Sequence, residues 1–203
     1  MEAISKSIDK GFDNLTESEK IEHIQFYFKR IMQVLGLDLS DSSLQDTPRR
    51  VAKMYVKEIF NGLNEDSFPS ITVFENDYGY DQMLIEKDIT LYSYCAHHFV
   101  PIIGRAHVAY YPTDYVVGLS KINRLVQHFS QKPQVQEILT VAIANALKET
   151  LQTEDVAVFI EADHLCVASR GIKDTNSSTQ TTFYGGKFKQ NQIKLEFLKS
   201  VRD

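Results

Sequence analysis

The sequence is short of several features that mark common classes of protein. Its longest uninterrupted apolar runs are about five residues, far below the ~20 that a membrane helix needs, so no membrane partner is predicted. Residues 1–15 contain no apolar stretch that could serve as a signal peptide, which predicts a cytoplasmic protein. Basic residues are not in excess, with 22 Lys and Arg against 27 Asp and Glu, and this balance argues against nucleic acid as the main partner.

A phosphate-binding loop of the common kind is also missing. The segment Gly185-Gly186-Lys187 lacks both the upstream glycine and the following Ser or Thr of a Walker loop. Any nucleotide is therefore expected to bind in another way. The composition that remains, with 43% apolar and 24% charged residues over 203 positions, is typical of a globular chain of one domain with an extension.

Helical periodicity dominates the first third of the chain. Thr16 and Glu19 form a capping-box pattern before an apolar stripe that ends near Gly36. A second helix is predicted to begin with Thr47 as its N-cap and Pro48 in its first turn. We therefore predict an N-terminal helical region over residues 1–65 and a catalytic domain over residues 66–203.

The remainder has the pattern of an α+β fold. Two long strands are predicted first, then a helix capped by Ser120 and a longer helix opened by Pro133, then two further strands and a C-terminal helix. The predicted strands cover residues 83–94, 102–111, 156–162 and 181–188. This order predicts an antiparallel sheet with helices on one face, and we expect self-assembly to hide the other face.

The two cysteines of the chain, Cys95 and Cys166, lie in clusters with histidine. Three of the six histidines fall in the segments C-A-H-H (95–98) and H-L-C (164–166), and a cytosolic location disfavours a disulfide. Cys95 and His98 have C-x-x-H spacing and Cys166 could add a third ligand. This donor set suits zinc and leaves a fourth position for water. The alternative is a pair of core thiols with hydrogen-bonded histidines.

His97 and His164 would then stand beside the metal. Because imidazole exchanges protons near neutral pH, the two could act as an acid–base pair. The alternative is that each one only orients a metal ligand. Gln136 and Glu137 begin the long helix and face away from its apolar stripe. Glu137 either complements the helix dipole or accepts two N–H donors from a planar base such as guanine.

Basic side chains gather at a predicted helix start. Lys121 and Arg124 follow Ser120, and a helix N-terminus with such residues can bind phosphate through free N–H groups and the helix dipole. Arg170 follows Cys166 by four residues, and Arg49, Arg50 and Lys53 lie in the first turn or two of the second predicted helix. For any one of these residues, an ordinary solvated surface position is the alternative.

Four segments of the sequence carry a resemblance to a known family: DTPRRVAKMYVKEIFNGL (46–63), LYSYCAHHFVPIIGRAHVAYYP (91–112), VGLSKINRLVQHFSQKPQVQEILT (117–140) and IEADHLCVASRGIKDTNSSTQTTFYGGKF (160–188). The motifs C-x-H-H, GLSKINR, QKPQVQE and H-x-C followed by RG occur in this order. In this combination the chain resembles GTP cyclohydrolase I over about three quarters of its length.

The resemblance implies a tunnelling fold, in which the unit assembles around a central barrel as a homodecamer with active sites between subunits. It implies hydrolytic opening of the guanine imidazole ring of GTP, with release of formate and formation of 7,8-dihydroneopterin triphosphate. That reaction is the first step of tetrahydrofolate and pteridine biosynthesis. The implied cofactor is Zn²⁺, held by Cys95, His98 and Cys166.

The resemblance also implies roles for further residues by position. His97 and His164 match the family's acid–base histidines, and Ser120 shares in the proton transfers. Gln136 and Glu137 match its guanine-reading pair. The residues that match contacts around the ribose and triphosphate are Ser120, Lys121, Arg124, Arg170, Arg50 and Lys53, the last two reaching in from a neighbouring subunit.

One position departs from the pattern, because the family usually has Glu where this chain has Ala96. The alternative function is therefore a weakened or non-catalytic zinc- and nucleotide-binding oligomer of the same fold. A second alternative is another tunnelling-fold enzyme, acting on a pterin or deazapurine. Such an enzyme would not require the GLSKINR and QVQE motifs together with the Cys/His/Cys set.

Overall fold

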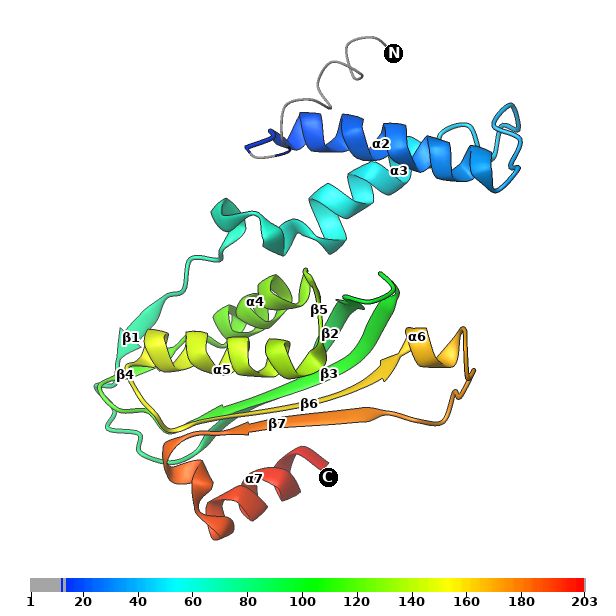
Figure 1. Ribbon diagram of the computed structural model, residues 1–203. Coiled ribbons are helices and arrows are strands. Elements are labelled where there is room, and N and C mark those ends of the chain that lie inside the picture. The colour runs from blue at the N-terminus through cyan, green and yellow to red at the C-terminus, as the bar shows by residue number, and fades with distance from the viewer. Residues whose placement is uncertain (1–11, 13, 203) are drawn as a thin grey trace. The chain divides into compact units, whose positions relative to one another are not determined.

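The computed structural model describes residue 12 and residues 14–202 of the chain (Figure 1). The chain divides into two compact units, Met1–Asn61 and Gly62–Asp203. The boundary predicted from the sequence, after residue 65, lies a few residues further along. Within the described residues, no helix is both long enough and apolar enough to cross a membrane.

The first unit is a pair of helices. Helix α2 (Glu17–Val34) begins at the predicted capping box, where the Glu19 N–H donates to Thr16 Oγ1 and the Thr16 N–H donates to the Glu19 carboxylate. Helix α3 (Thr47–Met54) packs against α2 and continues into a π-helical turn, η1 (Tyr55–Ile59). The prediction of Thr47 as N-cap was wrong by one residue, because Asp46 occupies that position with a backbone that is already helical.

The second unit is built on a five-stranded sheet with strand order β5-β2-β3-β6-β7 (Figure 1). Neighbouring strands are antiparallel except for the short β5, which runs parallel to β2. Two short strands form a separate antiparallel ribbon. The strands are β1 (Val73–Glu75), β2 (Leu84–Cys95), β3 (Pro101–Tyr110), β4 (Tyr115–Val117), β5 (Pro133–Gln134), β6 (Val156–His164) and β7 (Thr179–Tyr184).

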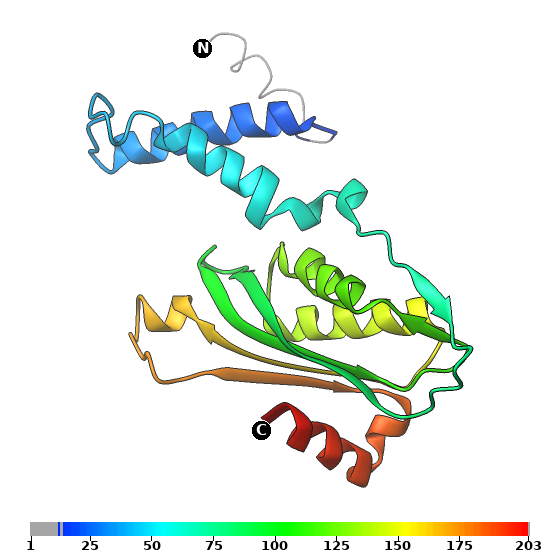
Figure 2. The same cartoon turned by 180° about the vertical axis from the view of Figure 1, so that it is seen from behind.

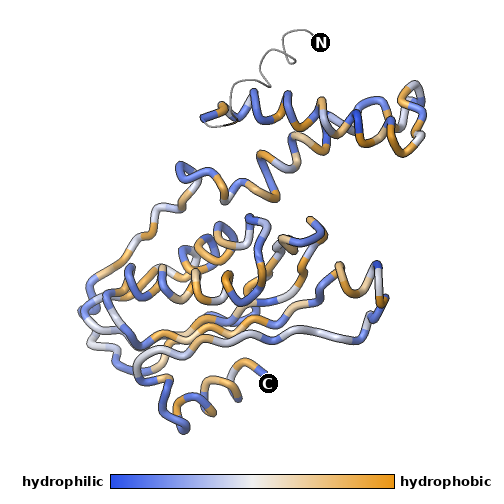
Figure 3. Tube along the Cα trace, in the orientation of Figure 1, coloured by the Kyte–Doolittle hydropathy of each residue, from blue (hydrophilic) through white to orange (hydrophobic). Residues whose placement is uncertain are grey.

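Helices α4 (Leu119–Ser130) and α5 (Gln136–Leu151) cover one face of this sheet. The main core lies between them and the strands, and Figure 3 shows apolar residues along this layer. Its fully buried members include Leu91, Ile122, Leu139, Val158 and Ile160. The two-strand, two-helix, two-strand order and the mixed α+β class are confirmed.

The expectation that helices cover only one face was wrong for the C-terminal helix. Helix α7 (Asn191–Arg202) and the turn before it, η4 (Gly186–Lys189), pack on the opposite face through Phe188 and Phe197 (Figures 1 and 2). The reason lies in β6, where Val156–Ile160 is buried without interruption. Val158 belongs to the α4–α5 core and Phe159 to the α7 core, so this strand needs cover on both faces.

Three predicted element boundaries differ in the structure. Pro133 does not open a helix, because Pro133–Gln134 pairs with the end of β2 as β5, and α5 begins only at Gln136. Ser120 is not an N-cap, since the extended backbone of Gly118 takes that place and Ser120 lies inside the first turn of α4. The last strand ends at Tyr184, because the chain turns at Gly186 with a φ of +45°.

Three short helical segments complete the described part of the chain. Their bounds are η2 (Asn61–Leu63), η3 (Glu65–Ser67) and α6 (Leu165–Ala168). Of these, α6 matters most for the candidate site, because it follows β6 directly and carries Cys166.

Candidate metal centre and substrate site

Strand ends bring the two cysteine clusters together. β2 ends at Cys95, a short turn follows, and β3 starts at Pro101. β6 is antiparallel to β3, so its last residue, His164, pairs with Ile102 at the same end of the sheet. The residues that follow His164 form α6 and place Cys166 opposite the turn after β2. Neighbouring antiparallel strands thus join segments that are about 70 residues apart in the sequence.

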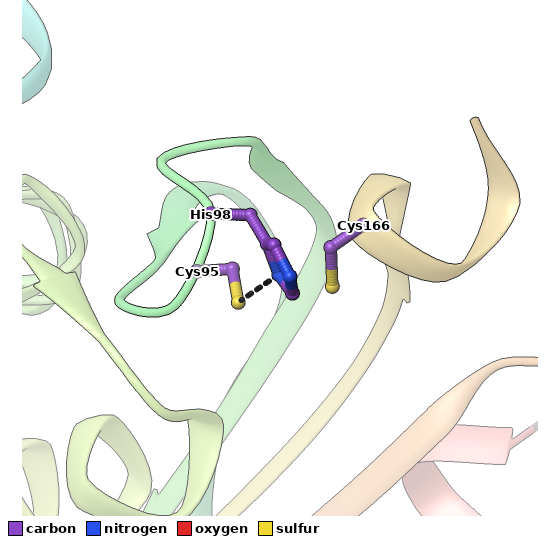
Figure 4. A group of neighbouring side chains, drawn as sticks. All are labelled: Cys95, His98 and Cys166. Atoms are coloured by element: carbon purple, nitrogen blue, oxygen red, sulfur yellow. Dashed lines mark hydrogen bonds between the residues drawn. The ribbon is translucent and has the colours of Figure 1, made fainter. Parts of the chain in front are cut away.

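Cys95, His98 and Cys166 form the predicted three-residue group (Figure 4). One ligand atom from each lies within 4.8 Å of the others, and Cys95 Sγ is 3.9 Å from His98 Nδ1. In a tetrahedral zinc site with bonds of about 2.0–2.3 Å, ligand atoms are about 3.5–3.8 Å apart. A small contraction would therefore close this group around one ion, and three protein ligands would leave a fourth position open.

The two thiols favour a cation between them. Cys95 is buried, with 5% of its surface exposed. The pKa of the Cys166 thiol is raised, first by burial and then by the hydrogen bond and the charge of Cys95. Because two neighbouring thiolates repel each other, a divalent cation is the natural compensation that allows both to ionise. The donor set and its electrostatics fit a metal ion, and zinc is the one that this mixture of sulfur and nitrogen suits.

His98 also contacts Arg170, which lies just after α6. The Arg170 Nη1 atom is 2.8 Å from His98 Nε2. Since a guanidinium group only donates, Nε2 is the acceptor and the proton of the neutral ring sits on Nδ1, which faces the Cys95 sulfur. A metal ion at Nδ1 would take the place of that proton.

His97 and Ala96 lie in the same turn and are both exposed. His97 Nδ1 is 3.7 Å from Cys95 Sγ, and the ring centroids of His97 and His98 are 6.3 Å apart. The backbone N–H of Ala96 donates to the Gln134 carbonyl on β5. This contact ties the turn to the start of α5.

His164 is brought to the same end of the sheet and contacts the start of α5. His164 Nε2 is 2.8 Å from Gln136 Oε1. Burial lowers the pKa of His164, and the nearby carboxylates of Glu137 and Asp163 oppose that shift. Glu137 itself is exposed in the first turn of α5. Glu137 and His164 therefore lie near each other, at the end of the sheet where α6 with Cys166 follows His164.

Gln136 is placed differently from the sequence prediction. Its side chain is only 1% exposed, and its amide nitrogen lies 3.0–3.3 Å from Ile160 O, Thr179 O and Thr181 Oγ1. Both amide hydrogens are thus used inside the fold. Sequence reasoning missed this contact because its partners lie 24 to 45 residues away on β6 and β7.

Comparison with known proteins gives a consistent result. The family model described as GTP cyclohydrolase I matches residues 24–202. A protein of Flavobacterium johnsoniae named GTP cyclohydrolase 1 is 55% identical over 96% of this chain and 86% of its own length. Proteins of the same name from Yersinia enterocolitica and Salmonella gallinarum are 57% and 54% identical, over 88% and 94% of this chain and 82% and 86% of theirs.

The chain belongs to the GTP cyclohydrolase I family. The family resemblance found in the sequence is thereby confirmed. The family is metal-dependent, and the Cys95–His98–Cys166 group of this chain could bind a metal ion. A solved structure, that of the archaeosine synthase QueF-Like in the apo form, matches 51% of this chain and 93% of its own at 14% identity with a TM-score of 0.44.

Ser120, Lys121 and Arg124, for which the sequence resemblance implied substrate contacts, lie at the other end of the sheet. β3 runs from the metal group to Tyr110, a span of about 30 Å for its ten residues. There the Val117 N–H donates to the Tyr110 hydroxyl, and α4 begins two residues later. α4 then runs back, so that the chain after it reaches β5 beside Cys95 (Figure 1). One copy of the chain therefore does not bring the start of α4 to the metal group.

Arg50 and Lys53, the remaining two predicted GTP cyclohydrolase I positions, belong to the first unit. Both are exposed on α3, and Arg50 forms an ion pair with Asp46 at 3.8 Å. An exposed ion pair of this kind is worth little, so Arg50 is available to another anion.

Proposed function

We propose that this chain catalyses the hydrolytic opening of the guanine imidazole ring of GTP, with release of formate and formation of 7,8-dihydroneopterin triphosphate. The observation that carries the proposal is the Cys95, His98 and Cys166 group within 4.8 Å, with His164 and Glu137 beside it, in a chain of the GTP cyclohydrolase I family. Cys95, His98 and Cys166 would hold Zn²⁺. Bound zinc supplies a water whose pKa is lowered towards neutrality.

The neighbouring residues then have distinct tasks. His97 and His164 hold and move protons, since imidazole titrates near the pH of the cell. The Glu137 carboxylate accepts the paired N–H groups on one edge of guanine, which only an acceptor-rich side chain can do. Gln136 has no amide hydrogen left for the base, because three acceptors on β6 and β7 surround its nitrogen.

Phosphate binding requires a second copy of the chain. Ser120, Lys121 and Arg124 stand in the first turns of α4, where free N–H groups and the helix dipole favour an anion. They are at the wrong end of the sheet to meet the metal group of their own chain, so we infer that a neighbouring copy supplies them. This arrangement favours a closed homo-oligomer, and the homodecamer implied by the sequence resemblance is our proposal for it. The predicted cytoplasmic location stays a prediction.

Arg170 is the proposed donor for the triphosphate. Its Nη1 atom donates to His98 Nε2 at 2.8 Å, and the guanidinium group has further N–H donors that this contact does not use.

The second candidate function is a zinc- and nucleotide-binding oligomer with weak or no catalysis. The observation that favours it is Ala96, an exposed residue in the turn between two members of the site, where the resemblance leads one to expect Glu. Ala supplies no carboxylate to a neighbouring histidine or to water. The metal group and the histidines do not depend on this position, so the enzyme remains the first proposal.

The deciding experiment is incubation of the zinc-loaded protein with GTP. We expect formate release and, after oxidation of the mixture, neopterin fluorescence. ATP and a chelator-treated sample serve as controls and should give neither product. Tight GTP binding without formate would favour the non-catalytic alternative. Absence of both GTP binding and zinc binding would contradict both functions.

A further inference from the structure

Gln136 lies at the centre of a hydrogen-bond network that joins α5 to β6 and β7. Its amide nitrogen is 3.3 Å from Ile160 O, 3.0 Å from Thr179 O and 3.0 Å from Thr181 Oγ1. Its amide oxygen is 2.8 Å from His164 Nε2. The Thr140 hydroxyl donates to the Gln136 carbonyl at 2.8 Å and lies 2.7 Å from Thr181 Oγ1. Both atoms of the amide are thus engaged.

Only one orientation of the Gln136 amide satisfies this network. The Ile160 and Thr179 carbonyls can only accept, so the group that faces them must be the amide nitrogen. Rotating the amide by 180° would bring its oxygen against two carbonyl oxygens in a buried place. Unmade hydrogen bonds of buried groups cost about 1–3 kcal/mol each, which excludes the rotated form.

The threonine hydroxyls support the same orientation. Thr140 has one hydroxyl hydrogen and gives it to the Gln136 carbonyl. In the short contact between the two threonines, Thr181 must therefore be the donor. Because its only hydroxyl hydrogen is donated to Thr140 Oγ1, Thr181 Oγ1 can only accept a hydrogen bond from the Gln136 amide. Three acceptors therefore face the amide nitrogen, and none of them can donate to a rotated amide.

The proton position on His164 follows from this. Gln136 Oε1 is an acceptor, so the His164 Nε2 atom 2.8 Å away must carry a hydrogen. In a neutral imidazole only one nitrogen is protonated. The lone pair of neutral His164 is therefore on Nδ1.

We propose that Gln136 is a positioning residue that holds the His164 ring in one orientation as the Nε2–H tautomer, so that the nitrogen with the free lone pair, Nδ1, is the one turned away from Gln136. The kinetic part of this inference rests on the proposed function.

This role differs from the reading of guanine that the sequence suggested for Gln136. A residue that reads the base contributes to substrate affinity, and its loss raises KM or relaxes the preference for guanine. A residue that fixes a tautomer contributes to the chemical steps, and its loss lowers kcat. The neighbouring Glu137 is exposed and is the better candidate for reading the base, so the two adjacent residues should give opposite kinetic signatures.

The direct test locates the hydrogen on His164 in the zinc-loaded wild-type protein, at a pH where the ring is neutral. Neutron diffraction, or NMR of protein with ¹⁵N-labelled histidine and His164→Asn for assignment, reports both ring nitrogens. We expect hydrogen on Nε2 and none on Nδ1. Hydrogen on Nδ1 in a protein that turns over GTP would overturn this inference and leave the proposed function standing.

Variants then test what the network does. In Gln136→Met the acceptor is lost, and we expect a mixture of tautomers with kcat about 10- to 100-fold lower and KM little changed, as for other residues that orient a functional histidine. Glu137→Gln should instead raise KM and leave the tautomer as in the wild type. A raised KM with unchanged kcat and tautomer in Gln136→Met would refute the positioning role.

Milder variants keep the inference testable where Gln136→Met does not fold. Thr181→Val removes one acceptor from the Gln136 amide at nearly constant volume, whereas Thr181→Ser retains the hydroxyl. We expect a partial loss of kcat for Thr181→Val, smaller than for Gln136→Met because two carbonyl acceptors remain, and full recovery for Thr181→Ser. Equal kcat and equal ¹⁵N spectra for both would contradict the network.

Discussion

The two ends of the sheet in the second unit both carry predicted functional groups but are built in different ways. At one end the ligand atoms of Cys95, His98 and Cys166 lie within 4.8 Å of one another, Arg170 contacts His98, and His164 is hydrogen-bonded to a buried glutamine. At the other end Ser120 and Arg124 are exposed on the first turns of α4. The first end is organised within one chain, and the second presents donors to something outside it.

The difference has a physical origin. At the metal end β2 and β6 end and β3 begins, and the pairing of these strands fixes where Cys95 and His164 lie. A helix N-terminus needs no such pairing, because its N–H groups and dipole favour an anion wherever it is exposed. Chemistry that depends on distances of 3–4 Å is therefore expected at the strand ends, and charge binding at the helix start.

The largest expected effect comes from removing a metal ligand at the metal end of the sheet. Cys166→Ser replaces a thiolate with a weak ligand and should remove zinc and formate release, by more than about 100-fold, since even residues that only orient a ligand are worth about 10- to 100-fold. Metal analysis and formate assay measure this. Ser169→Ala, on the residue that caps the same short helix, should keep both. Full zinc occupancy in Cys166→Ser would contradict the ligand assignment.

Mixed oligomers test whether the start of α4 in one copy completes the site at the metal group of another copy. Cys166→Ser and Arg124→Met should each be nearly inactive alone. If a site takes its metal end from one copy and its α4 start from another, random co-assembly at equal amounts restores about one quarter of the sites. Formate release from the co-expressed pair measures the recovery.

The control for this experiment pairs two changes at the same end. A mixture of Cys166→Ser with Glu137→Gln leaves every site with one defect, so its activity should equal the average of the two pure proteins. Absence of recovery in the first mixture, with normal assembly, would mean that the two ends do not meet between copies.

The smallest expected effect comes from adding a carboxylate at the metal end, in the turn after β2. Ala96→Glu adds a carboxylate between Cys95 and His97, where it could raise histidine basicity or position water, and such partners are commonly worth about 10- to 100-fold. We expect faster turnover with unchanged zinc content and GTP affinity. Ala96→Gln is the control of equal shape without charge. Equal turnover in all three proteins would mean that position 96 has no catalytic part here.

Local patterns in the sequence were sufficient for part of the site. The C-x-x-H spacing of Cys95 and His98 lies within one turn, so its geometry is set by a few residues of backbone. Cys166 could be added because a second cluster of cysteine and histidine is uncommon, although the pattern gave no distance. The capping box of α2 was likewise a local signal, since all its hydrogen bonds join residues three apart.

Other features depended on residues that meet only in the folded chain. The sequence suggested that Gln136 faces a base, whereas its amide is enclosed by β6 and β7. The resemblance gave Ser120 a share in the proton transfers, and only the structure shows that α4 starts at the end of the sheet far from the metal group of the same chain. Neither the direction of a helix along a sheet nor the partner of a buried amide is encoded in spacing, because both follow from how the strands pair.

The sequence by itself determined which chemistry this protein can perform, because side-chain type fixes what can bind zinc, move a proton or accept hydrogen bonds. It also determined the order of strands and helices, because periodicity reflects which face of an element is buried. The tertiary structure decided which of these groups work together. Strand pairing placed Cys166 and His164 at the same end of the sheet as Cys95, and it placed Gln136 within hydrogen-bond distance of His164. The direction of α4 placed Ser120 at the opposite end. Contacts between distant residues are set by the packing of the whole sheet and not by any local pattern.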